Sequence, residues 1–597
     1  MGAKETPGAA RREGTQVSEH TPTAGFDSGF DFIIVGGGPA GCILANRLTA
    51  DPSVRVLLLE AGPPDHWWDP RLHLPIAMGF PVGNPTYDWR YESEPEPGLN
   101  SRRLHHPRGR VLGGSSSING MIYERGHQAD YDRWAEEAKA PHWDYAHCLP
   151  YFRRLERCID EPRGTGRGRK GPQPLHRGPA EGPLFDAFFE AARQAGYAVV
   201  PDVNDDAQEG FSALDQAVYR GRRASAADAY LRPIQDRANL TVQCNALVSG
   251  VLFNGTRAVG VRFRGKAGEV AEVRGSEVIL CSGAIGTPQL LQLSGVGDAE
   301  HVQGLGLPVV HHLPGVGESL QDHLAVHVQH KCAQPVSAAD LRNKTKWPKI
   351  VLDAVVFGKG PGTRNPMQAG GWVRSDHAEG EPDLMFLFAP LAMHSADESV
   401  EVTAHGYQMH VGVMQSKARG SVKIVSRSPE AHPRILMNFL SDPMDEKRWV
   451  DAIRKARHLL GQPAFREFDA GETLPGPHLR SDEEILAWVR RVGRTGYHPT
   501  CSAPMGRDDL AVVDPDTMRV YGLDGLRVVD ASVMPSLTNA NTLAPTMMIA
   551  EKAADIILGN TPMAPEAPSQ PSRPASRPRV PAPVEQDTTP VSLFEPR

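Results

Sequence analysis

The chain has 597 residues, of which 40% are hydrophobic and 23% charged, a composition ordinary for a globular enzyme and a length too great for one core. Its net charge of −7 at pH 7 gives no reason to expect a nucleic acid as partner. No apolar run approaches the roughly 20 residues of a transmembrane helix, and the seven cysteines include no C-x-x-C pair, which favours a reducing compartment.

Both ends of the chain lack the composition of a folded domain. Residues 1–28 contain no apolar stretch and no secretory signal, and residues 561–597 are dense in Pro, Ser and Ala. Such segments bury too little apolar surface to fold, so we expect both to be disordered. We expect a cytoplasmic protein, and peripheral contact with a membrane stays open.

The first strong pattern is D-F-I-I-V-G-G-G-P-A-G-C at residues 31–42. It predicts a buried strand, a tight turn and a helix, the arrangement that brings backbone N–H groups to a pyrophosphate. Gly36 would make the turn, Gly38 would let the phosphates approach, and Gly41 would let the helix pack on the strand.

A second apolar run, residues 54–59, ends in Glu60, which lies 19 residues after Gly41. An acidic residue at this distance, at the tip of the second strand, is where a ribose hydroxyl is bound. NAD and FAD both satisfy the pattern, so these residues leave the choice of dinucleotide open.

The next segments predict an extension of the same domain. Residues 67–107, rich in Pro, Trp, Tyr and His, read as a long excursion that could cover a cofactor. Small residues at 113–117 would let the backbone pass close to a phosphate or a planar ring, with a plain Gly/Ser loop as the alternative. Helices are expected within 127–157 and 183–196, and residues 277–286 predict a strand that returns to the first sheet.

Residues 331–497 show a different pattern of apolar residues from the segments before them. Short apolar or alternating segments at 384–388, 409–414 and 420–425 predict strands of an antiparallel sheet. Helices are expected at about 443–461 and 481–491. We interpret this region as a substrate domain inserted before the chain returns to the first domain.

Two other kinds of site find little support. His323, His327 and His330 lie in a segment that alternates as a strand, without a neighbouring cysteine or carboxylate triad, so we predict no metal site. The chain also has no G-x-S-x-G elbow, so a serine hydrolase would lack its nucleophile signature.

Two long gapless stretches resemble the signatures of the glucose–methanol–choline (GMC) oxidoreductase family. Residues 109–119, G-R-V-L-G-G-S-S-S-I-N, continuing to Asp132, are similar to the first signature, and residues 283–297, G-A-I-G-T-P-Q-L-L-Q-L-S-G-V-G, to the second. The resemblance covers residues 30–560, is closest to bacterial choline dehydrogenase-like and alcohol dehydrogenase members, and implies FAD as cofactor.

The resemblance also implies the architecture, an α/β fold in which a Rossmann-like FAD-binding domain is interleaved with a substrate domain built on an antiparallel sheet flanked by helices. The expected division is a disordered segment at 1–28, the FAD-binding domain at 29–330 with an excursion at 150–225 toward the substrate side, the substrate-binding domain at 331–497, a C-terminal return at 498–560 and a disordered Pro-rich tail at 561–597.

Carried over residue by residue, the family pattern implies a set of cofactor contacts. These are Gly36, Gly38 and Gly41 on the pyrophosphate, Glu60 on the adenosine ribose, Gly113, Ser115, Asn119 and Met121 along the flavin, Val248 at the adenine, and Asp530 and Ala531 along the phosphate–ribityl chain.

The family's catalytic pair is matched by His498, in the stretch Y-H-P-T, and by Asn541, which lies 11 residues before Lys552. Oxidation of an alcohol requires the hydroxyl proton to leave as hydride moves to flavin N5, and a neutral imidazole suits that task near pH 7. The resemblance also implies that the helix at 544–558 points its N-terminus at the flavin, where its dipole favours negative charge.

Three departures bear on the substrate. Ile118 stands where some family members carry a histidine bonded covalently to FAD, so we expect non-covalent FAD. Gln368 stands where choline-handling members can place a glutamate, and Leu543 replaces a common polar residue. These departures favour oxidation of a primary alcohol to an aldehyde, with choline to betaine aldehyde as the alternative and a flavin-dependent lyase or decarboxylase as a further one. The electron acceptor, whether quinone, carrier protein or oxygen, stays open.

Overall fold

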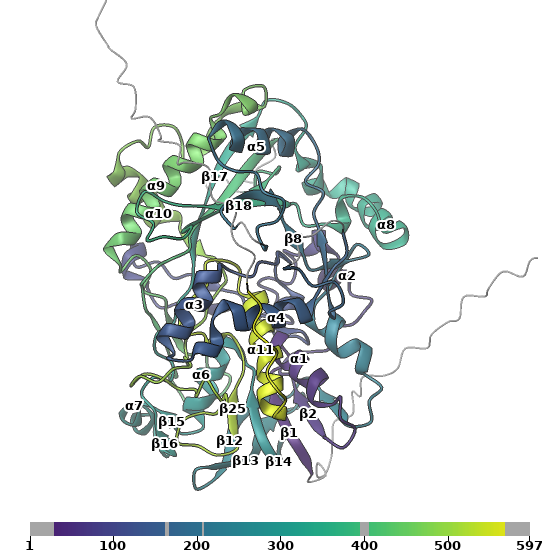
Figure 1. The fold of residues 1–597 in the computed structure, drawn as a ribbon, viewed down its shortest axis with the longest axis vertical. Coiled ribbons are helices and arrows are strands. Elements are labelled where there is room, and N and C mark those ends of the chain that lie inside the picture. The colour runs from purple at the N-terminus through teal and green to yellow at the C-terminus, as the bar shows by residue number, and fades with distance from the viewer. Residues whose placement is uncertain (1–28, 161–165, 206–207, 394–404, 568–597) are drawn as a thin grey trace, which may run out of the picture.

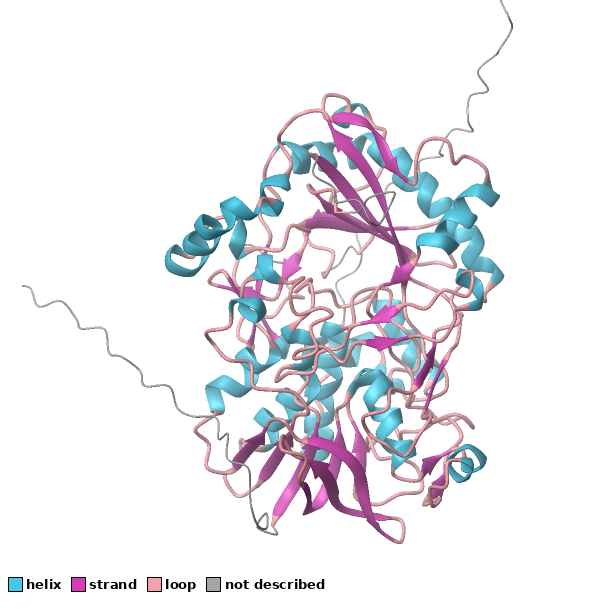
Figure 2. Ribbon diagram, turned by 180° about the vertical axis from the view of Figure 1, so that it is seen from behind, coloured by secondary structure: helices cyan, strands magenta, loops and turns pink. Residues whose placement is uncertain are grey.

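The computed structural model describes residues 29–160, 166–205, 208–393 and 405–567. Two sheets lie toward opposite ends of the molecule, a seven-stranded sheet at one end and a six-stranded sheet at the other (Figure 1). Helices flank both sheets, and a region of loops and short strands lies between them (Figure 2). The mixed α/β fold expected from the sequence is confirmed.

The seven-stranded sheet has the order β11-β2-β1-β14-β13-β12, with β25 paired to β14. Its central strand β1 pairs in parallel with β2 and with the C-terminal end of β14, where the apolar residues Val278, Ile279 and Leu280 are buried. The hairpin β12–β13 adds an antiparallel edge. The strands are β1 (Phe30–Val35), β2 (Val56–Leu59), β11 (Leu240–Gln243), β12 (Leu247–Asn254), β13 (Arg257–Arg264), β14 (Val270–Leu280) and β25 (Leu526–Val528).

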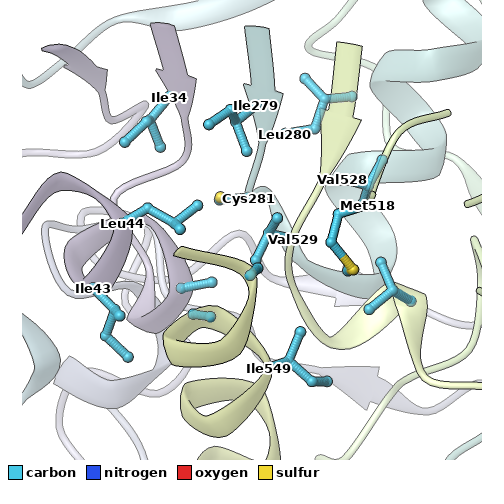
Figure 3. Packing of buried hydrophobic residues seen from close by; sticks show 14 of the residues in the cluster. Ile34, Ile43, Leu44, Ile279, Leu280, Cys281, Met518, Val528, Val529 and Ile549 are labelled. Atoms are coloured by element: carbon cyan, nitrogen blue, oxygen red, sulfur yellow. The ribbon is translucent and has the colours of Figure 1, made fainter. Parts of the chain in front are cut away.

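Two helices from opposite ends of the chain pack together against this sheet. They are α1 (Pro39–Leu48), which follows β1, and α11 (Leu543–Leu558). Figure 3 shows Ile43 and Leu44 of α1 and Ile549 of α11 within one cluster of hydrophobic side chains, and all three are fully buried. This packing places the turn after β1 and the start of α11 on the same side of the sheet.

The six-stranded sheet is antiparallel, with the order β18-β19-β20-β17-β23 and with β24 paired to β17. The helices α5, α9 and α10 pack on and around it. The strands are β17 (Leu324–Cys332), β18 (Ala369–Val373), β19 (Leu384–Ala389), β20 (Gly406–Val413), β23 (Asp469–Leu474) and β24 (Arg494–Thr495), and the helices are α5 (Pro183–Gln194), α9 (Pro443–Leu460) and α10 (Asp482–Val492).

Three boundaries differ from those expected. The boundary placed at 330 falls inside β17, because alternation marks a strand but not the sheet that it joins. The segment 420–425 forms β21 (Ser421–Lys423), which pairs with β22 (Arg434–Leu436) in a separate sheet. Residues 561–567 of the expected tail are described, and the Glu566 N–H donates to the Ala146 carbonyl (2.9 Å). Residues 1–28 and 568–597, also expected to be disordered, lie outside the described residues.

The remaining elements connect these layers. They include α2 (Pro70–His73), α3 (Gln128–Glu137), α4 (Tyr145–Leu155), α6 (Gly283–Leu293), α7 (Ala299–Gly304), α8 (Trp347–Phe357), β3 (Tyr91–Glu92), β4 (His105–His106), β5 (Glu156–Cys158), β6 (Gln173–Arg177), β7 (Gly210–Ala213), β8 (Asp215–Gln216), β9 (Val218–Tyr219), β10 (Arg222–Arg223), β15 (Val296–Gly297) and β16 (His311–His312). Within the described ranges, no helix is both long enough and apolar enough to cross a membrane.

Candidate functional site

A cavity of about 570 Å³ is bordered by both sheets. Its volume lies within the range of about 300–1,000 Å³ that is common for ligand sites. The segment 67–107, expected to act as a cover, supplies part of the wall through Met78, Val82 and Trp89. The part of the chain that the structure describes contains no group of His, Cys, Asp and Glu arranged to hold a metal ion.

Most of the residues expected at the site line this one cavity. They are Gly36, Gly38, Glu60, Ser115, Asn119, Met121, Val248, His498, Asp530, Ala531 and Asn541. Although they come from seven separate stretches of sequence, the two sheets and the packing of α1 on α11 bring them to one place.

Two of the expected glycines lie behind the wall. A Cβ atom on Gly41 would come within 2.0 Å of the Gly36 carbonyl oxygen, so this glycine serves the packing of helix on strand. The Gly113 N–H donates to the Gly37 carbonyl (2.7 Å). The adjacent Gly114 lines the cavity instead, and a Cβ there would lie 2.7 Å from the Gly38 Cα. The family resemblance implied a flavin contact at Gly113, whereas the glycine of this loop that lines the cavity is Gly114.

The N-termini of three helices meet at the cavity. The N-cap residues of α1, α6 and α11 are Gly38, Ser282 and Thr542, none of them with a side-chain cap, and all three line the cavity. A Cβ on Gly38 would meet nothing closer than the Cys281 carbonyl oxygen at 3.9 Å. Uncapped N–H groups and the positive ends of helix dipoles favour an anion. The wall therefore fits a pyrophosphate-containing cofactor.

Glu60 lies at the end of β2 with its carboxylate held on both sides. Oε2 accepts the Gly37 N–H (2.9 Å) and Oε1 accepts the Gly62 N–H (2.8 Å). Burial raises the pKa of Glu60 to about 7, against the lowering effect of these bonds. Each oxygen keeps a second lone pair, so the group can still accept ribose hydroxyls.

Asp530 is used differently from the contact that the family pattern implies. Its Oδ1 accepts from the Ser532 N–H (2.8 Å) and hydroxyl (2.6 Å), and its Oδ2 from the Gly283 N–H (2.8 Å) and the Thr287 hydroxyl (2.6 Å). These four bonds occupy the carboxylate's lone pairs. Asp530 thereby holds the start of α6 against the segment that follows β25. The adjacent Ala531 lines the cavity.

His498 is bonded through its ring to His323. The two Nδ1 atoms lie 2.9 Å apart, and His323 Nε2 lies 3.1 Å from the Met414 carbonyl oxygen. Because a carbonyl only accepts, the His323 proton is on Nε2, and its Nδ1 must accept the Nδ1–H of His498. Burial lowers the pKa of His323 to about 4, so the ring is neutral near pH 7. The lone pair of His498 is then on Nε2.

Asp322 holds the backbone of both histidines. Its Oδ1 accepts the His498 N–H (2.7 Å) and the His323 N–H (2.8 Å), and its Oδ2 accepts the Thr495 hydroxyl. Burial, followed by repulsion from His323, Arg108 and His410, holds the pKa of His498 well below 6.5. Sequence reasoning missed both partners. The stretch Q-D-H at 321–323 carries no local sign that it would lie beside residue 498.

Asn541 lies just before α11 and lines the same cavity as His498. Its Oδ1 is buried and has no hydrogen-bond partner among the described residues. A buried amide oxygen without a partner costs roughly 1–3 kcal/mol, so a donor from a ligand would be stabilising there.

The substrate side of the wall is apolar and basic. Met385, Leu387, Met393, Arg108 and Arg494 contribute to it. So do His327 and His410, whose facing ring nitrogens are 3.2 Å apart. His327, one of the three histidines considered as metal ligands, is therefore paired with His410 across the sheet between β17 and β20.

Gln368 does not line this cavity. Its Oε1 accepts the Ala180 N–H (3.2 Å), and the preceding Met367 faces the cavity instead. Gln368 therefore gives no reason to exclude choline as a substrate. The only carboxylates on the described wall are Glu60 and Asp530.

Comparison with known proteins places these features in a family. Family models described as GMC oxidoreductase match residues 30–325 and 416–550. The chain is 50% identical to oxygen-dependent choline dehydrogenases of Staphylococcus saprophyticus and Staphylococcus xylosus, over 90% of this chain and 96% of each relative. Among solved structures, pyridoxine 4-oxidase from Mesorbium loti matches with a TM-score of 0.81 at 31% identity, covering 89% of this chain and 100% of that one. A formate oxidase matches with a TM-score of 0.83 at 26% identity, covering 90% and 99%.

The chain therefore belongs to the GMC oxidoreductase family, as its two signature stretches predicted. It is an FAD-dependent enzyme acting on CH–OH donors and is choline dehydrogenase-like.

Proposed function

We propose that this GMC oxidoreductase oxidises a primary alcohol to an aldehyde, with His498 as the base. The observation that carries the proposal is the ring of His498, which lines the cavity while its Nδ1 is bonded to a neutral His323. That arrangement leaves a lone pair on Nε2. The depressed pKa of His498 keeps this lone pair available at neutral pH.

The chain's residues divide the work of such a reaction. His498 Nε2 takes the hydroxyl proton, and the Nδ1–H of the resulting imidazolium still donates to His323. Asn541 hydrogen-bonds the same substrate oxygen and orients the carbinol C–H bond without competing for the proton. FAD, when bound, supplies the hydride acceptor at N5.

The residues proposed to hold FAD are the N-termini of α1 and α6, Glu60 and the loop at 114–121. We infer that the cofactor is not covalently attached, because the cavity wall presents the aliphatic side chain of Ile118 at the position in question. An aliphatic side chain has no nucleophilic atom with which to form such a bond.

Choline is the substrate best supported by the relatives, since two choline dehydrogenases share half of their residues with this chain. Trp89, Tyr91 and Tyr497 line the cavity. Aromatic faces attract quaternary ammonium groups, by about 0.5–2 kcal/mol for each favourable contact.

An uncharged primary alcohol is the second candidate, and a specific observation favours it. Both carboxylates on the described wall, Glu60 and Asp530, already accept hydrogen bonds at the nucleotide end, whereas Arg108 and Arg494 line the cavity as well. A cationic substrate would find no carboxylate counter-charge there.

Anaerobic addition of choline and of 3,3-dimethylbutan-1-ol, its uncharged isostere, tests the proposal. Bleaching of the flavin absorbance is expected. Choline should bleach the flavin faster if the aromatic side chains determine specificity, and the isostere should bleach it faster if the lack of a carboxylate determines specificity. No bleaching by these or other primary alcohols would overturn the proposal. Product formation with the flavin still oxidised would favour the lyase or decarboxylase alternative, and readmitting air then tests oxygen as the acceptor.

A further inference from the structure

The helix α8 turns its apolar side chains toward solvent. Leu352, Val355, Val356 and Phe357 are each more than half exposed, and of its residues only Ala354 is buried. Figure 1 shows α8 at the outer edge of the molecule, away from both sheets. A surface helix of a globular protein normally buries its apolar stripe, so this helix has the reverse arrangement.

The helix is attached by a narrow inner face. Ala354 packs with Leu74 and Ala77, and a Cβ on Gly362 would lie 2.9 Å from the Ala354 Cβ. At about 100° per residue, Leu352 and Val356 lie on the side of the helix opposite Ala354 and point away from this contact. Their exposure therefore follows from the packing of Ala354 and is not a frayed helix end.

The apolar surface continues to the rim of the cavity described above. The ring of Phe80 meets that of Trp347 edge-on, with centroids 5.5 Å apart. Phe80 and Val82 are both exposed, and Val82 also lines the cavity. We call this surface the α8 face, defined by Phe80, Val82, Leu352, Val355, Val356 and Phe357.

Positive charge accompanies the α8 face. Lys344, Lys346, Lys349 and Lys359 are exposed on and beside the helix, and the Lys359 ammonium lies 5.2 Å from the centroid of the Phe357 ring. In residues 343–360 the only carboxylate is Asp353, which is paired with Lys349. The segment is thus basic although the whole chain carries a net charge of −7.

We propose that the α8 face docks on an anionic lipid bilayer, with the apolar side chains in the headgroup region and the lysines on the phosphates. Exposed apolar side chains bordered by lysines are the combination that binds such a surface. A second copy of the chain fits less well, because pairing α8 with α8 would bring the lysines of both copies together. Docking would turn the rim of the cavity toward the membrane.

Sedimentation of the full-length protein with vesicles tests the proposal. Vesicles of phosphatidylcholine alone are compared with vesicles that also contain phosphatidylglycerol. Wild type is expected in the pellet only with the anionic vesicles, and V355D/V356D is expected to bind them at least about tenfold more weakly. Lys344→Glu should weaken binding at least about fivefold, because losing one basic residue costs roughly 1 kcal/mol and the new carboxylate adds repulsion.

Val270→Asp is the matched control. Val270 is 60% exposed and Val356 is 61% exposed, but Val270 begins β14 at the far end of the seven-stranded sheet. The control is expected to bind vesicles as wild type does, and circular dichroism checks that every variant is folded. Wild type that stays in the supernatant with both kinds of vesicle would overturn the proposal. So would a dimer of the wild type in solution that V355D/V356D dissociates, because the face would then be an interface between copies.

Discussion

His323 and His498 share a hydrogen bond between their Nδ1 atoms, which lie 2.9 Å apart. The Met414 carbonyl at the far side of His323 sets the direction of that bond. Two neutral imidazoles therefore connect a fixed carbonyl to His498, which lines the cavity and carries its lone pair on Nε2. The tautomer of the proposed base follows from a residue 175 positions earlier in the chain.

Replacing His498 with alanine should lower the rate of anaerobic flavin reduction by about 10²–10⁴-fold, because the proton acceptor is lost. The flavin content of the purified protein should not change, since none of the proposed nucleotide contacts involves this side chain. Stopped-flow absorbance checks the rate. A rate within about twofold of wild type would remove His498 from the mechanism.

His323→Leu should lower kcat by about tenfold and leave FAD bound. Without an acceptor for its Nδ1–H, the His498 ring is free to adopt the other tautomer, in which Nε2 carries the proton. His330→Leu is the control from β17, the strand that directly follows His323, since His330 is also buried but is bonded to Asp469 (2.8 Å), away from the cavity. Equal losses in the two variants would show a general structural effect and contradict the positioning role.

The pH dependence of flavin reduction should reflect the low pKa of His498. Burial and neighbouring positive groups disfavour the imidazolium, so the neutral base persists as the pH falls through 6.5, the usual pKa of histidine. The acid limb of kcat/KM should therefore have its midpoint below pH 6.5. In His323→Leu the neutral acceptor of the imidazolium Nδ1–H is lost, so the midpoint should fall further. A wild-type midpoint at or above 6.5 would contradict this explanation.

Replacing Gly38 or Gly41 of the first motif with alanine should affect cofactor binding in one case and protein stability in the other. Gly38→Ala places a Cβ in open space where phosphates are proposed to lie, so the variant should fold but bind FAD at least about tenfold more weakly, roughly 1.4 kcal/mol. Gly41→Ala places a Cβ 2.0 Å from the Gly36 carbonyl oxygen, so the protein itself should be destabilised. Flavin absorbance and thermal unfolding separate the two effects. A Gly38→Ala protein with full flavin content would contradict the proposed cradle.

Local patterns predicted much of the fold. The strand, turn and helix at 30–48 could be predicted because neighbouring residues alone determine them, through an apolar run, glycines and helical spacing. The antiparallel sheet and its helices at 443–460 and 482–492 followed from periodicity in the same way. The strand β17 was assigned to the wrong domain, because its partner β20 lies some 80 residues later and no local signal names it.

The candidate site was also predicted only in part. Of the thirteen residues that the family resemblance implied, eleven line the cavity, including His498 and Asn541. The resemblance did not predict that the Asp530 carboxylate accepts hydrogen bonds from Gly283, Thr287 and Ser532. Nor did it predict that Gln368 bonds to Ala180 outside the cavity. Those outcomes depend on which backbone groups the folded chain places within about 3 Å of each side chain, which a linear motif does not encode.

The most direct test of the central claim is an anaerobic single turnover that measures flavin and product together. Wild type is mixed with an excess of whichever of choline and 3,3-dimethylbutan-1-ol bleaches it faster, and aldehyde is quantified when the absorbance change ends. Oxidation by hydride transfer predicts one aldehyde for each flavin bleached, with the same ratio but a much slower approach in His498→Ala. Aldehyde without bleaching, or bleaching at the same rate in both proteins, would contradict it.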